Sequence, residues 1–174
     1  FIQAYLACVA FADDQIGKVL DALDASPYAD NTLVIITSDH GYHMGEKEYL
    51  FKYSPWEESA RVPLVIAGPG VAENKECVVP VSLLDIYPTL VDAAGLVPLH
   101  KLDGHSLRPL LEKPGAGEWT GPLVSLTAIG SKLPVKKNTP ASAKDQHFSI
   151  RSERYRYIRC RNGEEELYDH RNDP

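Results

Sequence analysis

The first element expected from the pattern of apolar and polar positions is a long helix over residues 1–25. Its apolar residues recur at helical spacing, with charged residues between them, so the segment predicts an amphipathic helix. Asp13 and Asp14 are consecutive in this helix and point in different directions, which favours a solvated face over a pair of metal ligands. The apolar positions are Tyr5, Cys8, Val9, Ala12, Ile16, Val19, Leu20 and Leu23.

Two short apolar runs, residues 33–37 and 62–67, are the next elements. Their length and their β-branched residues are typical of strands buried on both faces of a parallel or mixed α/β sheet. A helical turn is expected between them at residues 55–60, with Glu57 and Glu58 near its amino end. Helices and buried strands in this order indicate an α/β fold.

A second helix is predicted over residues 82–95. Ser82 suits its N-cap and Asp85 stands at the capping-box spacing, while Gly95 provides a stop. Pro88 predicts a kink near the first turns of the helix.

The last third of the chain predicts an antiparallel meander of three or four strands packed on a helix. Apolar and charged residues alternate there, which indicates a sheet with one buried face. A turn-rich segment over residues 113–118 is the best boundary, so we expect domains at 1–112 and 113–174. The expected strands are residues 123–127, 148–151, 155–160 and 165–169.

Composition narrows the functional classes. The 174 residues are 44% hydrophobic, enough for a buried core, and the formal charge of −6 argues against non-specific nucleic-acid binding. No apolar run is long enough to span a bilayer, and no signal peptide is recognised. Cys8, Cys77 and Cys160 are widely spaced and predict incidental free thiols instead of disulfides or a metal site.

Candidate chemistry begins where the first predicted strand ends, in Ser38-Asp39-His40-Gly41. The carboxyl edge of such a sheet is where ligands bind, and Gly41 allows the sharp turn that brings Asp39 and His40 together. A carboxylate and an imidazole are competent ligands for a divalent cation. Alternatively Asp39 only caps the turn and His40 is merely polar, and these residues alone leave the two interpretations evenly balanced.

The wider sequence resembles the sulfatase family, and most closely its iduronate, choline and bacterial polysaccharide sulfatase branch. The resemblance is carried by motifs in order along nearly the whole chain: SDHGYHMGEK at 38–47, KYS at 52–54, WEESARVPL at 56–64, DGHSL at 103–107, RSERYRYI at 151–158, ELYD at 166–169 and NDP at 172–174. It implies the second half of an alkaline-phosphatase-like mixed-sheet sandwich followed by a small antiparallel β subdomain. In the family, the first helix packs on the sheet.

The resemblance also implies roles for individual residues. Asp39 and His40 match two ligands of a divalent cation, which the family identifies as calcium, although an imidazole is less typical of calcium than oxygen donors. Lys52 matches an active-site lysine that contacts the sulfate oxygens and assists the leaving group. Apart from the resemblance, three histidines are weaker substrate-binding candidates: His43, which could instead simply be exposed, His105 and His147. Arg61 could reach the site or pair with Glu58, and the ion pair is the favoured interpretation.

Family members hydrolyse sulfate esters with a formylglycine made from a Cys or Ser in a C/S-x-P-S-R motif. That motif does not occur in these 174 residues. We therefore expect the nucleophile and further metal ligands in a preceding N-terminal half, and we expect residues 1–174 alone to be inactive. Such enzymes are often exported, which is compatible with a periplasmic or secreted protein.

The substrate expected by resemblance is a sulfated small molecule or glycan. The polar segment at residues 130–145 carries Lys132, Lys136, Lys137 and Lys144, which could guide a polyanion but are better interpreted as a solvated loop. Three alternatives stay open: a phosphate or phosphonate ester hydrolase of the same superfamily, a non-catalytic glycan-binding relative, and a purely structural role for the Asp-His-Gly turn.

Overall fold

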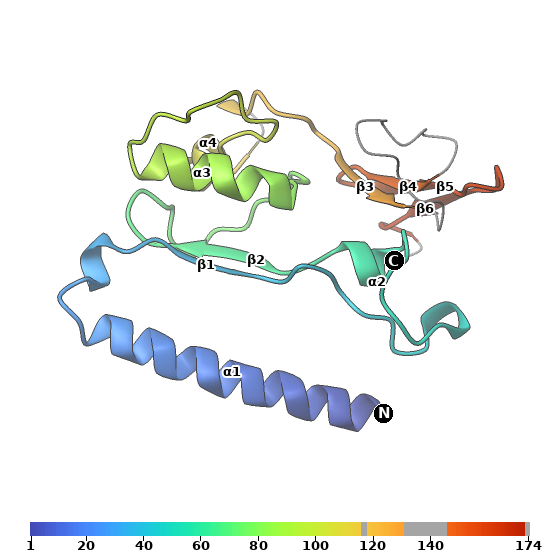
Figure 1. The fold of residues 1–174 in the computed structure, drawn as a ribbon, viewed down its shortest axis with the longest axis horizontal. Helices are drawn as coiled ribbons and strands as arrows, with labels where there is room; N and C mark the ends of the chain where they lie inside the picture. Colours follow the sequence, from blue (N-terminus) through green and yellow to red (C-terminus); the bar gives the residue numbers. More distant parts are fainter. Residues whose placement is uncertain (116–117, 131–145, 173–174) are drawn as a thin grey trace.

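A computed structural model describes residues 1–115, 118–130 and 146–172 (Figure 1). The four lysines of the 130–145 segment lie outside these residues. The helices are α1 (Ile2–Asp24), α2 (Glu57–Ala60), α3 (Ile86–Ala93) and α4 (Arg108–Glu112), and the strands are β1 (Val34–Thr37), β2 (Leu64–Ala67), β3 (Ser125–Ile129), β4 (His147–Arg151), β5 (Tyr155–Arg159) and β6 (Glu165–Asp169).

The two apolar runs form β1 and β2, but their surroundings differ from the prediction. They pair with each other as an antiparallel two-stranded sheet, with Val34 opposite Ala67 and Thr37 opposite Leu64. No residue of either strand is fully buried, so the expectation of strands covered on both faces in a parallel or mixed sheet is not met within this chain. The carboxyl end of β1 still leads directly into Asp39 and His40.

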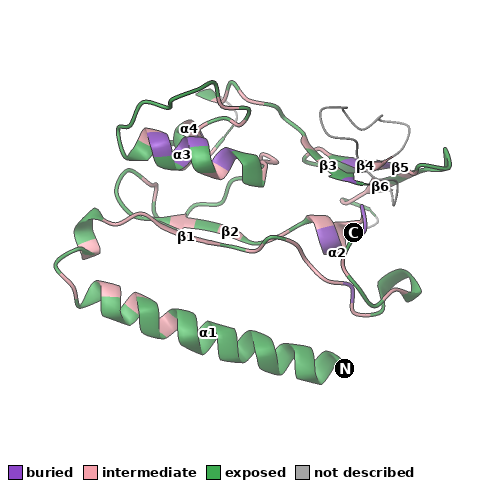
Figure 2. Cartoon of the chain, in the orientation of Figure 1, coloured by how far each residue is buried: buried purple, intermediate pink, exposed green. Residues whose placement is uncertain are grey.

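Helix α1 forms where the periodicity predicts it, yet it contains no buried residue. Figure 2 shows almost the whole helix as exposed. The family resemblance led us to expect its apolar face to be packed on the sheet, and in this chain that face is open to solvent. The exposed apolar side chains include Tyr5, Leu6, Val9, Phe11, Ile16 and Val19.

Helix α3 confirms the local signals read from the sequence. Ser82 and Asp85 form the predicted capping box, and Gly95 follows the helix with a φ of +65°, a conformation that glycine adopts easily. A 3₁₀ turn at Leu83–Asp85 precedes the α-helix, which begins at Ile86 and has Pro88 in its first turn. The kink near Pro88 stays a prediction.

The C-terminal strands form the predicted meander, in the order β3-β4-β5-β6 with antiparallel pairs throughout. The faces of β5 are not those expected from an apolar-in, charged-out pattern: Arg156 is buried beside Ile158, whereas Tyr155 is exposed. The buried apolar residues of the described chain are few, at two separate places, and they are Val91, Leu107, Leu110, Ile129 and Ile158.

Candidate active site

Asp39 and His40 present their side chains together at the end of β1. The backbone N–H of His40 donates to Asp39 Oδ1 at 3.0 Å, and His40 Nε2 lies 3.5 Å from Asp39 Oδ2. His40 Nδ1 lies 2.8 Å from the carbonyl oxygen of Gly41. Because a carbonyl can only accept, Nδ1 carries the proton and Nε2 keeps its lone pair. The pair thus offers an imidazole nitrogen and a carboxylate oxygen on one side, which is the ligand orientation that outer hydrogen bonds maintain in metal sites.

The turn after His40 has room only for glycine. A Cβ at Gly41 would lie 1.9 Å from the carbonyl oxygen of Glu58, far inside van der Waals contact. The backbone N–H of Gly41 donates to the carbonyl of Ser59 at 2.9 Å. The strand end is therefore held directly against α2, so any residue with a side chain at position 41 would displace Asp39 and His40.

Lys52 reaches the same region from the following loop. It is half-buried, and its carbonyl accepts a hydrogen bond from the Tyr49 hydroxyl at 3.2 Å. Within the described residues its ammonium group has no hydrogen-bond or ion-pair partner. Asp39, His40 and Lys52 all line one large open cleft, together with residues of β2, α2 and the C-terminal strands, so the structure places the predicted catalytic and metal-binding residues around one shared space.

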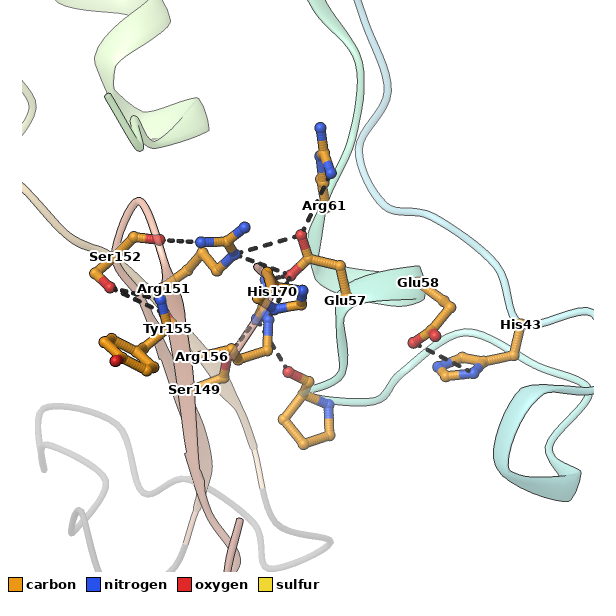
Figure 3. A network of polar contacts seen from close by, with 11 residues as sticks. His43, Glu57, Glu58, Arg61, Ser149, Arg151, Ser152, Tyr155, Arg156 and His170 are labelled. Carbon is orange, nitrogen blue, oxygen red and sulfur yellow. Dashed lines mark hydrogen bonds and ion pairs between the residues drawn. The ribbon is translucent and has the colours of Figure 1, made fainter. Parts of the chain in front are cut away.

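One wall of this cleft is built around Glu57, the first residue of α2. Figure 3 shows Arg151, Arg156 and His170 converging on its carboxylate. The Arg156 guanidinium donates at 2.6 Å and Arg151 at 3.2 Å, while His170 Nε2 lies 3.5 Å away. Arg61 is also paired with Glu57, at 3.7 Å, so the expected pairing of Arg61 with Glu58 is wrong.

Burial and charge compete in this cluster. Burial alone would raise the pKa of Glu57, but the charges of Arg156 and Arg151 outweigh it and hold that pKa below its usual value. Burial lowers the pKa of His170, and the nearby arginines lower it further against the attraction of Glu57. Glu57 is therefore charged and His170 neutral near pH 7. The cluster then carries one negative and three positive charges.

The weaker substrate-binding candidates do not lie in this cleft. His43 is completely buried, neither facing a ligand nor exposed as expected. His105 is exposed near Trp119, with ring centroids 5.9 Å apart. His147 is half-buried in β4, and its Nδ1 accepts from the Arg161 N–H at 3.5 Å.

The donor set at the end of β1 is suitable for a cation but small. In the part of the chain that the structure describes, no group of three or more His, Cys, Asp or Glu side chains gathers at one point. Asp39 and His40 are two donors, whereas calcium takes six to eight oxygen-type ligands. They fit two positions of a larger ligand set. All three cysteines are free thiols, Cys8 and Cys77 exposed and Cys160 half-buried, so they are incidental thiols and not buried ones. None of the helices described is both long and apolar enough to cross a bilayer.

Comparison with known proteins decides the family. The Sulfatase family model matches residues 1–96. The chain belongs to the sulfatase family. It is 39% identical over 173 residues to a sulfatase of Formosa agariphila and 35% identical over 176 residues to a choline-sulfatase of Rhizobium meliloti. These matches cover 99% of the chain but only 31% of each relative, so the chain spans about a third of their length.

Solved structures agree with this assignment and confirm the alkaline-phosphatase-like α/β fold class. A protein solved in complex with its substrate, D-glucosamine-2-N,6-O-disulfate, matches 98% of the chain and 34% of its own at a TM-score of 0.76 and 30% identity. The phosphonate monoester hydrolase of Agrobacterium radiobacter matches 95% of the chain and 34% of its own at a TM-score of 0.77 and 33% identity.

Two features of the site were not predicted from the sequence. Glu57 was interpreted only as a residue of a helix amino end, and Arg156 as a charged position of an alternating strand. A detectable signal existed for Arg156, because it shares strand parity with Ile158, the position most suited to the core. Arg61, four residues after Glu57, is a local partner, but the two arginines that donate hydrogen bonds to Glu57 lie about one hundred positions later, and no local pattern indicates them.

Proposed function

We propose that the full-length protein is a sulfuric ester hydrolase that acts on a sulfated carbohydrate. The observation that carries this proposal is the shared cleft: Asp39, His40 and Lys52 line one cavity in a chain that belongs to the sulfatase family. A disulfated glucosamine is the substrate of one protein of similar structure, which supports a sulfated sugar as the substrate class.

In the proposed reaction, Asp39 and His40 hold a divalent cation, with calcium the first candidate. A cation bound there would neutralise negative charge on the transferring group and orient it. Gly41 contributes by allowing α2 to support the turn, and its carbonyl keeps the His40 ring oriented with Nε2 free. Other ligands, and a formylglycine nucleophile, would come from outside residues 1–174, so we propose that these residues alone have no turnover.

The ammonium group of Lys52 stabilises negative charge on the oxygen of the departing alcohol and on the sulfate oxygens. Negative charge develops on these oxygens as the sulfur–oxygen bond breaks, and a fixed ammonium stabilises that charge most where water is excluded. Lys52 suits this task because it is half-buried and its charge is not taken up by an acidic side chain among the described residues. The arginines around Glu57 add positive charge to the same cleft wall.

A second candidate is hydrolysis of phosphonate or phosphate esters. The specific observation in its favour is the structural match to a phosphonate monoester hydrolase, whose identity of 33% is as high as that of the sulfate-ester enzyme compared above. The Asp39–His40 pair and Lys52 suit a phosphoryl group as well as a sulfuryl group, because both are tetrahedral and anionic.

The test is a substrate panel on the full-length protein, with nitrophenyl sulfate, nitrophenyl phosphate, a phenylphosphonate ester and sulfated glucosamines. We expect the highest kcat/KM on a sulfated sugar, loss of activity with a chelator and recovery with calcium. Mass spectrometry of the nucleophile peptide should show an aldehyde. A preference for the phosphonate ester supports the second candidate, and glycan binding without any turnover would overturn both.

A further inference from the structure

We propose that His43 is a positioning residue for Lys52: its ring, buried behind the cleft, holds the Lys52–Ser54 turn in the conformation that presents the ammonium. This inference rests on the proposed function, because it assigns His43 a part in the same reaction. It also replaces the expectation that His43 touches the substrate.

His43 holds the loop on both sides of Lys52. Its backbone N–H donates to the carbonyl of Phe51 at 2.9 Å, and its Nε2 forms a 2.6 Å hydrogen bond with the Ser54 hydroxyl. Lys52 lies between these two attachment points. The Tyr49 hydroxyl provides a third, through its bond to the Lys52 carbonyl. A lysine in an unsupported loop would lack such restraint.

The backbone between the attachment points is strained. Tyr53, directly after Lys52, has a φ of +72°, a left-handed conformation that is uncommon for a residue other than glycine. Such conformations are unfavourable and persist only where surrounding contacts enforce them. The His43–Ser54 bond on one side and the bond from the Tyr53 hydroxyl to the Gly130 carbonyl, at 3.0 Å, are the contacts that enforce it here.

The environment of His43 suits positioning and excludes direct contact with substrate. The ring has no exposed surface, and the rings of Tyr49 and Trp56 pack edge-on against it with centroids 5.3 and 5.8 Å away. His43 Nδ1 is buried, and a Glu58 carboxylate oxygen lies 3.9 Å from it, beyond hydrogen-bond distance. The hydrogen bond between Nε2 and the Ser54 hydroxyl is therefore the polar contact that fixes the ring.

The consequence concerns the reach of Lys52. Its ammonium stands on a flexible four-carbon stem and has no partner in the described chain, so only the backbone can define where it acts. A displacement of about 1 Å in a reacting group can lower a rate by about 100-fold. Loss of the His43–Ser54 bond should therefore reduce kcat although the His43 ring is fully buried and does not line the cleft.

The experiment is a double-mutant cycle in the full-length protein, using Ser54→Ala, Lys52→Ala and the double variant on the best ester of the substrate panel. Ser54→Ala should lower kcat by about 10- to 100-fold with little change in KM. In the Lys52→Ala background it should cause no further loss, because the group that it positions is absent. His43→Gln, which retains a polar atom near Ser54, should recover most of the activity that His43→Ala loses.

A matched control is Ser106→Ala, which removes a serine hydroxyl bonded to Asp92 at 2.6 Å on the α4 side, far from the Lys52 loop in the sequence. It should leave kcat unchanged. Hydrogen exchange should accelerate in residues 43–54 of His43→Ala and stay unchanged in α3. Equal losses from Ser54→Ala with and without Lys52, or unchanged exchange in the loop, would overturn the inference alone. Absence of any ester hydrolysis by the wild-type protein would overturn the proposed function, and this inference with it.

Discussion

Two adjacent acids of α2 have opposite surroundings, although both are partly buried. Glu57 faces the meander and is bound by two arginines of β4 and β5, with Arg61 and His170 close by. Glu58 faces the Lys52 loop, where its nearest recorded partner is the buried ring of His43 at 3.9 Å. One side of the helix is therefore held by short charge-assisted bonds and the other by a long contact.

The difference distinguishes charged groups that hold elements of the fold together from charged groups that are available to react. Charge-assisted bonds to a buried guanidinium are strong and hold the meander against α2. Elsewhere in the same cleft, Lys52 has no ionic partner among the described residues, and Asp39 is 86% exposed. Reactive groups need unshared charge, because a lysine that is already paired would have less to offer a developing anion.

The largest effect is expected on stability, from a substitution of Glu57, because its ion pairs bind the meander to α2. Glu57→Gln would leave Arg156, which is 3% exposed, without its counter-charge. The loss of one partner of a buried pair costs about 3–5 kcal/mol, so the free energy of unfolding of the full-length protein should fall by about that amount in urea titrations. Glu112→Gln, which breaks an exposed pair with Arg108, should have a much smaller effect. Equal effects would show that the Glu57 cluster contributes no more than a surface pair.

The second largest effect is expected for Lys52→Ala, which should act on the rate and not on folding. We expect kcat to fall by about 100- to 1,000-fold, the cost typical of removing one group that stabilises transition-state charge. The thermal midpoint should stay near that of the wild type. Lys101→Ala, at an exposed lysine, is the control and should have normal kinetics. Normal turnover in Lys52→Ala would remove Lys52 from the mechanism.

Gly41→Ala tests the contact between the Asp39–His40 turn and α2. The added Cβ would overlap the Glu58 carbonyl at 1.9 Å, and the necessary shift should cost about 1–3 kcal/mol and weaken calcium binding measured by calorimetry. Gly17→Ala is the matched control, since a Cβ there meets nothing within 4 Å. Its interior helical position should make the protein slightly more stable. Normal calcium affinity in Gly41→Ala would contradict the contact between the turn and α2.

The smallest effect concerns Asp169 in β6. Its carboxylate accepts from Arg154 Nε at 2.8 Å and Nη2 at 2.6 Å, and these bonds lower the pKa of Asp169 to about 2. The unfolded value is about 3.9, so the unfolded state binds more protons between these values and the stabilisation is lost as the pH falls from about 4 to about 2.

The measurement for Asp169 is the difference in thermal midpoint between the wild type and Asp169→Asn across that range. Above pH 4 the thermal midpoint of the wild type should exceed that of Asp169→Asn by a constant difference. This difference should shrink toward zero as the pH falls to 2. The same pH dependence should be weaker in an Arg154→Gln background, where the hydrogen bonds from the Arg171 N–H and the Asn172 side chain to Asp169 remain. A difference that persists at pH 2 would rule out the ionised pair as its source.

The elements predicted correctly depend on neighbours in the chain. The capping box of Ser82 and Asp85 spans four residues, and each meander strand is connected to the next along the sequence. The place of Asp39 and His40 at a strand end also belongs to this group, since they follow β1 directly, whereas their role as metal ligands stays a prediction. Residues that are close in the sequence can form few alternative local structures, so periodicity and spacing are sufficient to predict these elements.

The errors concern burial and partner choice. The apolar face of α1 predicts a helix but does not indicate whether anything covers it, and this chain leaves it exposed. Arg156 appeared to be a surface charge because arginine is seldom buried without a partner, and its partner is 99 residues away. His43 was expected near the ligand because it follows the Asp-His-Gly turn, yet Ser54 and two aromatic rings enclose it.

By itself, the sequence determined the order of helices and strands, the Asp39–His40 pair at a strand end and the resemblance that singled out Lys52. Only the tertiary structure decided that these three residues share a cleft, that Glu57 binds the meander and that His43 lies behind Lys52. The physical reason is the range of the interactions. Hydrogen bonds within a turn are encoded by adjacent residues, whereas a buried charge pair or a strained loop exists only after distant segments have packed together.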